Sequence, residues 1–558
     1  KLTLFYAGNE DRTLMIEAQA GTPDEGGVPE SVVASALRAA HEAAKLLIEP
    51  QRRLQRAIGK EKLDPVQQTP EQAKLRHDVF DRSSEKLRAL YKEEIQCKHT
   101  RGKRMAELKD EIVNSMTEEG MSFTNNEIEQ AFFWVSSRVM RDMIFEDKKR
   151  LDGRGIRELR QLGAESNVLP VVHGSSIFER GNTQALATVT IGKLIDAQKL
   201  DAPVGPDERR MMLHYSFPSF SINETPRRGG LSRREIGHGA LAERSIAPVI
   251  PSLEDFPYAV RVTSEIMESN GSTSMAAICS GTLALLDAGV PLKRPVAGIS
   301  IGLCTRSNDD GKIEAYKLLA DIIGWEDAFC DMDCKIAGTD TGITGFQLDL
   351  KLKGIPYEIM EEAIGIAKKA RTAILANMGD CLAKEREEMS PYAPRIVTIP
   401  IDPSKIGELI GPGGKNIKRI VEESGCEINI EDDGRVLIYS MSAEGLEVAK
   451  ECIEGITAEV EVGKLYRGKV VSIKEFGCFV EVLPGKDGLV HISELANFRV
   501  KKTEDIVKDG DEIWVKCIGV DDKGRVKLSR KAAMEERKAE FSDDEEGGSP
   551  DAGDDSEE

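Results

Sequence analysis

GWEDAFCDMDCKIAG, residues 324–338, decides the fold of the surrounding domain, because its second half reads as a strand with one charged face. From residue 331 charged and apolar side chains alternate, which is the period of a half-buried strand. The charged face carries Asp331, Asp333 and Lys335. Carboxylates this close repel one another unless a cation or a proton joins them, and hard oxygen ligands favour Mg²⁺ or Mn²⁺. The stretch therefore predicts a metal-binding strand, with a solvated strand face as the alternative.

Strands and helices alternate on both sides of this stretch, from about residue 149 to residue 383. ALATVTIG at residues 185–192 and AGISIGL at residues 297–303 have the composition of strands, and the region is rich in glycine. This succession predicts one domain of mixed structure, either α/β or α+β.

A run of hydroxyl side chains precedes the expected helix in ESNGSTSMAAICSGTLALLDAG, residues 268–289. Ser272, Thr273 and Ser274 follow Gly271 directly. Exposed amides at a helix N-terminus, with added hydroxyl donors, suit an anion such as phosphate. The stretch therefore predicts a phosphate-binding loop, and an ordinary Ser/Thr cap on a buried helix is the alternative.

Basic side chains gather in RRGGLSRREIGHGALAER, residues 227–244. Arg233 and Arg234 are adjacent, and His238 follows in a glycine-containing context. Guanidinium groups match phosphate oxygens in a bidentate way. We interpret the stretch as part of a phosphate or RNA site; the alternatives are a basic surface loop and a structural histidine.

Two distant segments of the chain share one pattern of elements. Residues 9–45 and residues 341–374 both give an alternating strand, a turn and an Ala-rich helix that begins at proline. We interpret them as copies of an internal repeat, with a chance likeness of two strand–helix units as the alternative. Because the chain opens on Lys1 within a strand-like stretch, we expect residues 1–50 to be the C-terminal edge of a first copy. Residues 51–147 are highly charged with helical spacing, which predicts an all-α connector.

Further along the chain, residues 405–440 read as a helix, a glycine-rich loop, a second helix and hairpin strands. This is the KH arrangement of single-stranded nucleic-acid binding. Gly411, Gly413 and Gly414 let the backbone approach phosphates, and Lys415 adds positive charge. A generic glycine-rich turn is the alternative.

The next segment, residues 465–495 together with residues 520–529, reads as a five-stranded OB barrel. Phe476, Phe479 and His491 offer stacking faces for bases, and Arg525 can meet the phosphate backbone. Core packing is the alternative for a single phenylalanine, but it explains the three rings together poorly.

The charge, the cysteines and the hydrophobic runs of the sequence limit the classes of protein to which the chain can belong. The net charge of −20 opposes nucleic-acid binding only on average, because the tail from Phe541 holds nine acidic residues and no basic one. We expect this low-complexity tail, residues 541–558, to be disordered. The ten cysteines form no CxxC pair, and the sequence has neither a secretory signal nor the ~20-residue apolar run that spans a bilayer. We therefore expect a cytoplasmic protein with reduced thiols and no membrane segment.

Taken in order, these segments resemble the polynucleotide phosphorylase family over about residues 1–531. Five stretches look like signatures of that family's second, catalytic RNase PH domain: DGRGIREL (152–159), FERGNTQALATVTIG (178–192), SRREIGHGALAER (232–244), ESNGSTSMAA (268–277) and DMDCKIAGTDTGI (331–343). The resemblance implies a multi-domain α+β chain. Its expected parts are a remnant of a first RNase PH-type domain (1–50), an all-α linker (51–147), a catalytic RNase PH-type domain of the ribosomal protein S5 domain 2-like fold (148–390), a KH domain (395–458) and an S1-type OB-fold β-barrel (460–531).

The resemblance also implies roles for individual residues. Asp327 and Asp333 match metal-binding aspartates with Lys335 beside them, Ser272, Thr273 and Ser274 match the phosphate loop, and Arg233, Arg234 and His238 match a basic stretch of the active site.

The implied activity is processive 3′-to-5′ phosphorolysis of single-stranded RNA in messenger RNA degradation, with Mg²⁺ or Mn²⁺ as cofactor. It consumes inorganic phosphate, releases nucleoside 5′-diphosphates and runs in reverse as template-independent polymerisation. A homotrimer is expected when the first domain is complete, together with RNA-decay partners. The alternatives are a catalytically inactive RNA-binding scaffold and a hydrolytic exoribonuclease.

Overall fold

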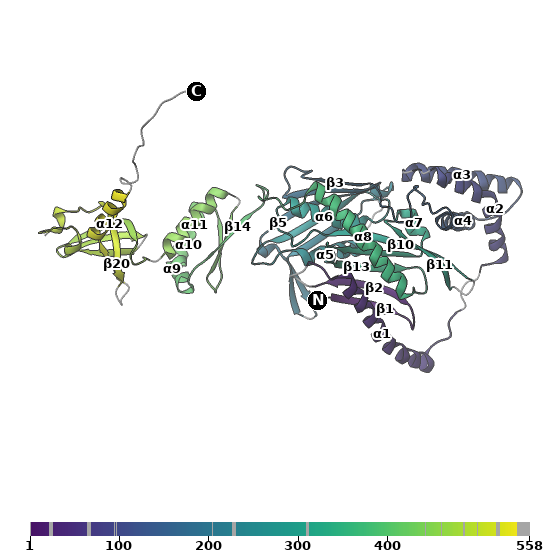
Figure 1. The fold of residues 1–558 in the computed structure, drawn as a ribbon, viewed down its shortest axis with the longest axis horizontal. Coiled ribbons are helices and arrows are strands. Elements are labelled where there is room, and N and C mark those ends of the chain that lie inside the picture. The colour runs from purple at the N-terminus through teal and green to yellow at the C-terminus, as the bar shows by residue number, and fades with distance from the viewer. Residues whose placement is uncertain are drawn as a thin grey trace, which may run out of the picture. The chain divides into compact units, whose positions relative to one another are not determined.

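The computed structural model describes residues 2–543 apart from 22–25, 64–67, 94, 96, 204, 226–229, 309–311, 441, 459, 484–485, 499 and 521–524. The predicted acidic tail lies outside the described residues from residue 544 onward. The chain divides into two compact units, Lys1–Ala393 and Pro394–Glu558. Each unit is described by itself (Figure 1).

A six-stranded sheet joins the N-terminal hairpin to the central domain of the first unit. Its order is β1 (Leu2–Gly8), β2 (Thr13–Ala20), β13 (Ile343–Leu350), β12 (Met332–Gly338), β10 (Ala297–Ser307) and β11 (Ile313–Ala320). All neighbouring strands in this order are antiparallel. The N-terminal strands therefore extend the sheet that carries Asp333.

The two segments with a shared sequence pattern are neighbours in this sheet. One is β2 with α1 (Glu30–Ile58), and the other is β13 with α8 (Tyr357–Cys381). Strand β2 pairs with β13, and α1 contacts α8 (Figure 1). Helix α1 contains Pro50 and continues to Ile58, with its second half exposed.

A second sheet has five strands, in the order β3 (Leu162–Ser166), β4 (Gly174–Arg180), β5 (Thr183–Gly192), β9 (Ala259–Glu268) and β8 (Met211–Ser216). Only its β8–β9 pair is parallel, and β8 lies at one edge of the sheet. A separate ribbon pairs β6 (Gln198–Ala202) with β7 (Gly205–Arg209). The domain is therefore α+β, with mainly antiparallel sheets.

Helix α6 (Thr273–Asp287) lies between the two sheets, since it contacts β4, β5 and β9 of one and β10 of the other. All of its residues are buried, which explains why small side chains dominate it. Helix α5 (Arg233–Ile246) packs on β8, β13 and α6. The short helix α7 (Gly324–Phe329) leads into β12. The start of α6 is thus fixed within the core of the domain.

Three helices form the predicted all-α segment: α2 (Pro70–Lys92), α3 (Lys98–Glu118) and α4 (Asn125–Glu146). Capping boxes begin α2 at Thr69 and α4 at Thr124. Their apolar faces share one core with Ile322, Ile323 and Phe329, around the start and end of α7. The helical segment therefore packs directly behind the expected metal site.

The second unit contains two small folds. The first has the sheet β14 (Arg395–Pro400), β16 (Arg435–Ser440), β15 (Glu427–Ile430) and helices α9 (Ile406–Ile410), α10 (Lys415–Ser424) and α11 (Ala443–Thr457). The second is a closed barrel of β17 (Leu465–Lys474), β18 (Gly477–Leu483), β19 (Lys486–His491), β21 (Val526–Ser529) and β20 (Glu512–Val520), followed by α12 (Arg530–Asp543). The predicted five-stranded barrel is confirmed. Among the described helices of the whole chain, none is both long and apolar enough to cross a membrane.

Candidate active site

The loop of Ser272, Thr273 and Ser274 meets helix α7, which carries Asp327, at two glycines. Gly271 has φ +88°, and Ser272 caps α6 in the left-handed region at φ 59°. A Cβ on Gly271 would lie 2.8 Å from the backbone nitrogen of Gly324, the first residue of α7. The same nitrogen donates a hydrogen bond of 3.2 Å to the carbonyl of Asn270. The close approach of these backbones therefore places the start of α6 against the start of α7.

The three hydroxyls of the loop have different partners. Ser272 Oγ shares a hydrogen bond with Ser300 Oγ, and Thr273 Oγ1 accepts one of 2.7 Å from Tyr215. Ser274 Oγ is buried and has no hydrogen-bond partner among the described residues. Because Thr273 Oγ1 accepts from Tyr215, its own hydrogen is left to donate elsewhere.

The predicted acids lie on α7 and β12. Lys335 Nζ is 2.8 Å from Asp333 Oδ2, with the two side chains only 11% and 13% exposed. Burial raises the pKa of Asp327, and the negative charge of Asp333 raises it further. The structure therefore brings the predicted pair of carboxylates together, with Lys335 bound to one of them.

His238, on α5, faces the same cluster. Its Nδ1 lies 3.3 Å from the Tyr215 hydroxyl. Burial, together with the positive charges of Lys335 and Arg234, lowers the pKa of His238 to about 3. The imidazole is therefore neutral near pH 7, next to two cationic side chains.

The two adjacent arginines have different surroundings. The Arg234 guanidinium lies over the ring of Phe217, 5.5 Å from its centre, and its charge also acts on Asp327. Arg233 is on the exposed N-terminal turn of α5, and no described contact joins it to the cluster. Of the two predicted arginines, Arg234 is the one that the structure brings to the site.

Asp331, the first acid of the predicted charged strand face, is bound by side chains of other segments. Its carboxylate accepts hydrogen bonds from both terminal nitrogens of Arg141, at 2.7 and 2.8 Å, and from the amide and hydroxyl of Thr305, at 2.9 and 2.8 Å. Strand β12 begins only at Met332. Asp331 is therefore committed to an ion pair with α4.

Two neighbours of the cluster were missed in the sequence. Tyr215 lies on β8, within hydrogen-bonding distance of Thr273 and His238. Its strand alternates buried and exposed side chains, so the sequence pattern indicates only that Tyr215 is a core residue. Lys351 follows β13 and donates to the carbonyls of Asp327 and Ala328, the latter at 3.0 Å. Neither side chain carries a local motif that would single it out.

Buried ion pairs hold the segment that carries Asp327. Arg150 is bidentate to Glu326, and both side chains are fully buried. Asp321, with φ 56°, pairs with Arg160 and Arg180. Because each buried charge is paired, the segment before and within α7 is fixed by charge-assisted hydrogen bonds.

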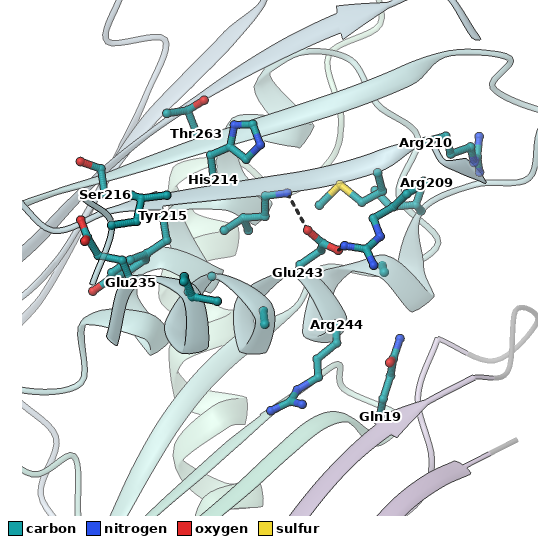
Figure 2. Close-up of a pocket in the computed structure, with 18 of the residues that line it drawn as sticks. Gln19, Arg209, Arg210, His214, Tyr215, Ser216, Glu235, Glu243, Arg244 and Thr263 are labelled. Carbon is teal, nitrogen blue, oxygen red and sulfur yellow. Dashed lines mark hydrogen bonds and ion pairs between the residues drawn. The ribbon is translucent and has the colours of Figure 1, made fainter. Parts of the chain in front are cut away.

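A cavity of about 970 Å³ lies between α5 and the edge strand β8. Figure 2 shows the side chains that line it. Glu243 Oε2 accepts from the amide of Leu213 at 3.0 Å, so a side chain of α5 covers part of the strand edge. The residues labelled there include Arg209 and Arg244, but none of the predicted site residues lines the cavity. The cavity therefore adjoins the cluster of Asp327 through Tyr215, which belongs to both.

The glycine loop of the second unit has the backbone that its sequence predicts. Gly411, Gly413 and Gly414 have φ values of 70°, 62° and 77°, and a Cβ on Gly413 would meet nothing within 4 Å. Lys415 begins α10 and is exposed, as are Lys418 and Arg419. The loop is therefore open to a nucleic-acid backbone, with positive charge on the following helix.

The barrel places its predicted stacking residues on one side of a hairpin. Gly477 pairs with His491 and Phe479 with Leu489, so Phe479 and His491 are diagonal neighbours on one face of β18 and β19. Phe476, in the turn before β18, is 50% exposed. Arg525 is also exposed and precedes β21, which pairs with β19.

Four family models match the chain in succession. They are "Polyribonucleotide nucleotidyltransferase, RNA binding domain" at residues 74–155, "3' exoribonuclease family, domain 1" at 158–291, "KH domain" at 396–455 and "S1 RNA binding domain" at 459–531. Polyribonucleotide nucleotidyltransferase of Akkermansia muciniphila is 51% identical over 544 residues, which cover 97% of this chain and 74% of that protein. The chain belongs to the polyribonucleotide nucleotidyltransferase family.

Other members of the polyribonucleotide nucleotidyltransferase family give the same coverage. The Bacillus subtilis protein is 47% identical over 544 residues, 96% of this chain and 74% of that protein. This chain therefore spans about three quarters of these relatives. Among solved structures, the crystal structure of rice Rrp46 aligns with 41% of this chain and 98% of its own, at 20% identity and a TM-score of 0.32.

The acids of this family member fit a divalent cation. Asp333 Oδ1 is buried and has no hydrogen-bond partner among the described residues. Asp349 lies directly across from Asp333 in the β12–β13 register, and like charges in that position repel. No group of three or more His, Cys, Asp or Glu side chains forms a metal cage in the described part of the chain. Two carboxylates suit Mg²⁺, which keeps waters and takes substrate phosphate oxygens as its other ligands.

Proposed function

We propose that this chain shortens single-stranded RNA from its 3′ end with inorganic phosphate, releasing nucleoside 5′-diphosphates. The observation that carries the proposal is the Gly271–Gly324 contact, which holds a hydroxyl loop and a carboxylate pair side by side. A phosphate-binding loop beside a metal site is what phosphoryl transfer to phosphate requires. The membership of the polyribonucleotide nucleotidyltransferase family agrees with this reaction.

In this proposal the start of α6 holds inorganic phosphate. Thr273 has a hydrogen to donate, and the unpartnered Ser274 Oγ gains an acceptor. The amides at the start of α6 and the charge of Arg234 add to the attraction. A bound phosphate is thereby oriented for attack and kept from diffusing away.

The reaction exchanges one phosphorus–oxygen bond for another. A phosphate oxygen attacks the phosphorus of the last phosphodiester, and the bond from that phosphorus to the O3′ of the preceding nucleotide breaks. The O3′ takes a proton, and the terminal nucleotide leaves as a diphosphate. Because the bonds formed and broken are similar in energy, excess diphosphate drives the reverse polymerisation.

Asp327 and Asp333 would hold the cation, Mg²⁺ or Mn²⁺, and Lys335 neutralises the remaining charge of Asp333. When bound, such a cation stabilises the negative charge that develops on the phosphate oxygens. Neutral His238 contacts the Tyr215 hydroxyl that donates to the loop, and orients that hydroxyl.

We assign RNA retention to the second unit. The open glycine loop with Lys415 offers phosphate contacts, and Phe476, Phe479 and His491 offer stacking faces with little sequence preference. Continued grip on the strand between cleavages would make degradation processive. We also propose, from the family resemblance, a cytoplasmic homotrimer that acts on messenger RNA with partners of RNA decay.

The test uses labelled single-stranded RNA with phosphate and Mg²⁺ supplied or omitted. The proposal requires nucleoside diphosphates, and it requires that product release stop when either phosphate or Mg²⁺ is left out. Monophosphates formed without phosphate would identify a hydrolase. RNA binding without any product, in every condition, would identify a scaffold.

A further inference from the structure

A groove connects the helical segment to the phosphate loop. It is formed by the start of α3, the single-turn helix η2 (Ser219–Ile222) and the end of β9, and it encloses about 520 Å³. This volume lies within the range of small-ligand pockets and accommodates a nucleotide. Its lining is mixed in chemistry: Lys98, His99, Gly102, Lys103, Phe220, Ser221, Ile222, Asn223, Met267, Glu268 and Ser269.

Hydrogen bonds fix the groove to the active-site loop. Lys98 Nζ donates to the carbonyl of Ser269 at 2.9 Å, and the amide of Ser269 donates to the carbonyl of Ser221, also at 2.9 Å. Ser269 stands two residues before Gly271, where the phosphate loop begins. The floor of the groove therefore runs directly into the loop.

Two lysines of the groove lie near the active-site arginine or along the same wall. Burial lowers the pKa of Lys98; the negative charge of Glu268 raises it, and the positive charge of Arg234 lowers it. Lys103 stands one turn along α3 from His99; its side chain is 70% exposed, and its Nζ lies 3.9 Å from Glu107 Oε1 in an exposed pair. Lys98 and Lys103 thus line the same groove, and the charge of Arg234 acts on Lys98 at its inner end.

The walls offer both surfaces that a nucleotide needs. The side chain of Phe220 is 58% exposed and that of Met267 is 36% exposed, although both line a cavity. An exposed ring beside lysines is the usual platform for a stacked base with its phosphate held by charge. Glu268 is the one acid of the lining, and its carboxylate can accept a hydrogen bond from a ribose 2′-hydroxyl.

We propose that this groove binds one nucleotide of the RNA substrate, upstream of the 3′-terminal nucleotide, with its base on Phe220 and its phosphate near Lys103. The proposal rests on the proposed function for the direction of the strand. It gives the helical segment a direct part in holding RNA, separate from the glycine loop and the barrel. Phe220 and Lys103 then determine how well substrates of more than a few nucleotides are held.

Binding is measured without phosphate, so that no turnover is needed. An oligoadenylate carrying 2-aminopurine at each position in turn is mixed with the full chain, and stacking on an aromatic ring changes the fluorescence of that base. We expect one position near the 3′ end to lose its signal in Phe220→Ala and to keep it in Phe5→Ala, a control with a ring that is 65% exposed on β1. Loss at every position, or at none, would overturn the proposal.

Turnover then separates this inference from the reaction itself. With phosphate and Mg²⁺, Phe220→Ala and Lys103→Ala should each raise KM for long RNA about tenfold, while the shortest oligonucleotides, which do not reach the groove, are degraded as by the unchanged chain. An equal loss at all lengths would overturn the groove assignment. An unchanged chain that binds 2-aminopurine RNA with a Phe220-dependent signal but releases no diphosphate would refute phosphorolysis and leave the groove standing.

Discussion

The phenol of Tyr215 donates a 2.7 Å hydrogen bond to Thr273 Oγ1, and its ring meets the imidazole of His238 edge-on at 5.4 Å between centres. Since the tyrosine hydrogen goes to Thr273, the 3.3 Å contact with His238 Nδ1 requires the imidazole to donate. The three side chains then form a chain with one direction, from His238 through Tyr215 to Thr273. Its last member, Thr273, still has a hydroxyl hydrogen to donate, and in the proposed function the acceptor is phosphate.

Tyr215→Phe keeps the ring and removes the link in this chain. Losing one neutral hydrogen bond is worth about 1 kcal/mol, so we expect KM for phosphate to rise about fivefold with little change in RNA affinity. Steady-state kinetics at varied phosphate, with RNA binding measured in parallel, check this. Tyr258→Phe, at another buried tyrosine, is the control; equal effects of both changes would show only a general structural loss.

Asp333→Asn removes one of the two proposed metal ligands but keeps the size of the side chain. We expect kcat to fall by about a hundredfold or more, because stabilisation of developing charge in an active site is worth that much. The affinity for RNA, measured without phosphate, should stay within about twofold, since stacking and phosphate contacts lie elsewhere. Asp340→Asn, in an exposed pair with Arg294, should leave both quantities unchanged. A parallel loss of RNA binding would mean that Asp333 supports the fold.

Arg141→Met removes the ion-pair partner of the Asp331 carboxylate, which is largely buried. Breaking a buried pair by removing one partner costs about 3 kcal/mol, so the first unit should unfold at a lower denaturant concentration. The matched change, Arg138→Met, removes an exposed i,i+4 pair on the same helix and should cost less than about 0.5 kcal/mol. Similar costs for the two variants would contradict the special position of Arg141.

His238 makes stability depend on pH in a stated direction. Its folded pKa of about 3 is below the ordinary value of 6.5, so between these values the unfolded chain binds more protons than the folded one. The contribution of the neutral His238 side chain to the free energy of unfolding is therefore complete above pH 6.5. It is lost progressively as the pH falls toward 3. Thermal unfolding at pH 7 and pH 5 should show a smaller acid loss for His238→Asn than for the unchanged chain. His214→Asn, at an exposed histidine, should behave like the unchanged chain.

The local patterns of the sequence were enough for much of this site. The alternation after residue 331 predicts Asp333 and Lys335 on one strand face, where they form a 2.8 Å pair. The stretch after Ser274 predicts a helix rich in small residues, which is present as α6. Both features depend on residues that are close in the sequence, and the periodicity of the sequence can therefore predict them.

Contacts between distant residues were beyond such patterns. Asp331 obeys the same alternation as Asp333, yet Arg141, 190 positions earlier, takes its carboxylate. Tyr215 reaches Thr273 across 58 positions. Only the packing of α4 and β8 against the central domain decides these partners, and no spacing within either segment encodes it.

The pairing of β2 with β13 has a consequence for how the molecule could be divided. Residues 2–20 supply two strands of a sheet in which β13 alone separates them from the strand of Asp333. A chain cut between α1 and α2 should therefore stay associated through this ladder and the Arg244–Glu17 ion pair of 2.7 Å. Expressed as two polypeptides, the hairpin with α1 and the remainder would form a complementing pair, in which the smaller fragment restores the larger one by covering its open edge.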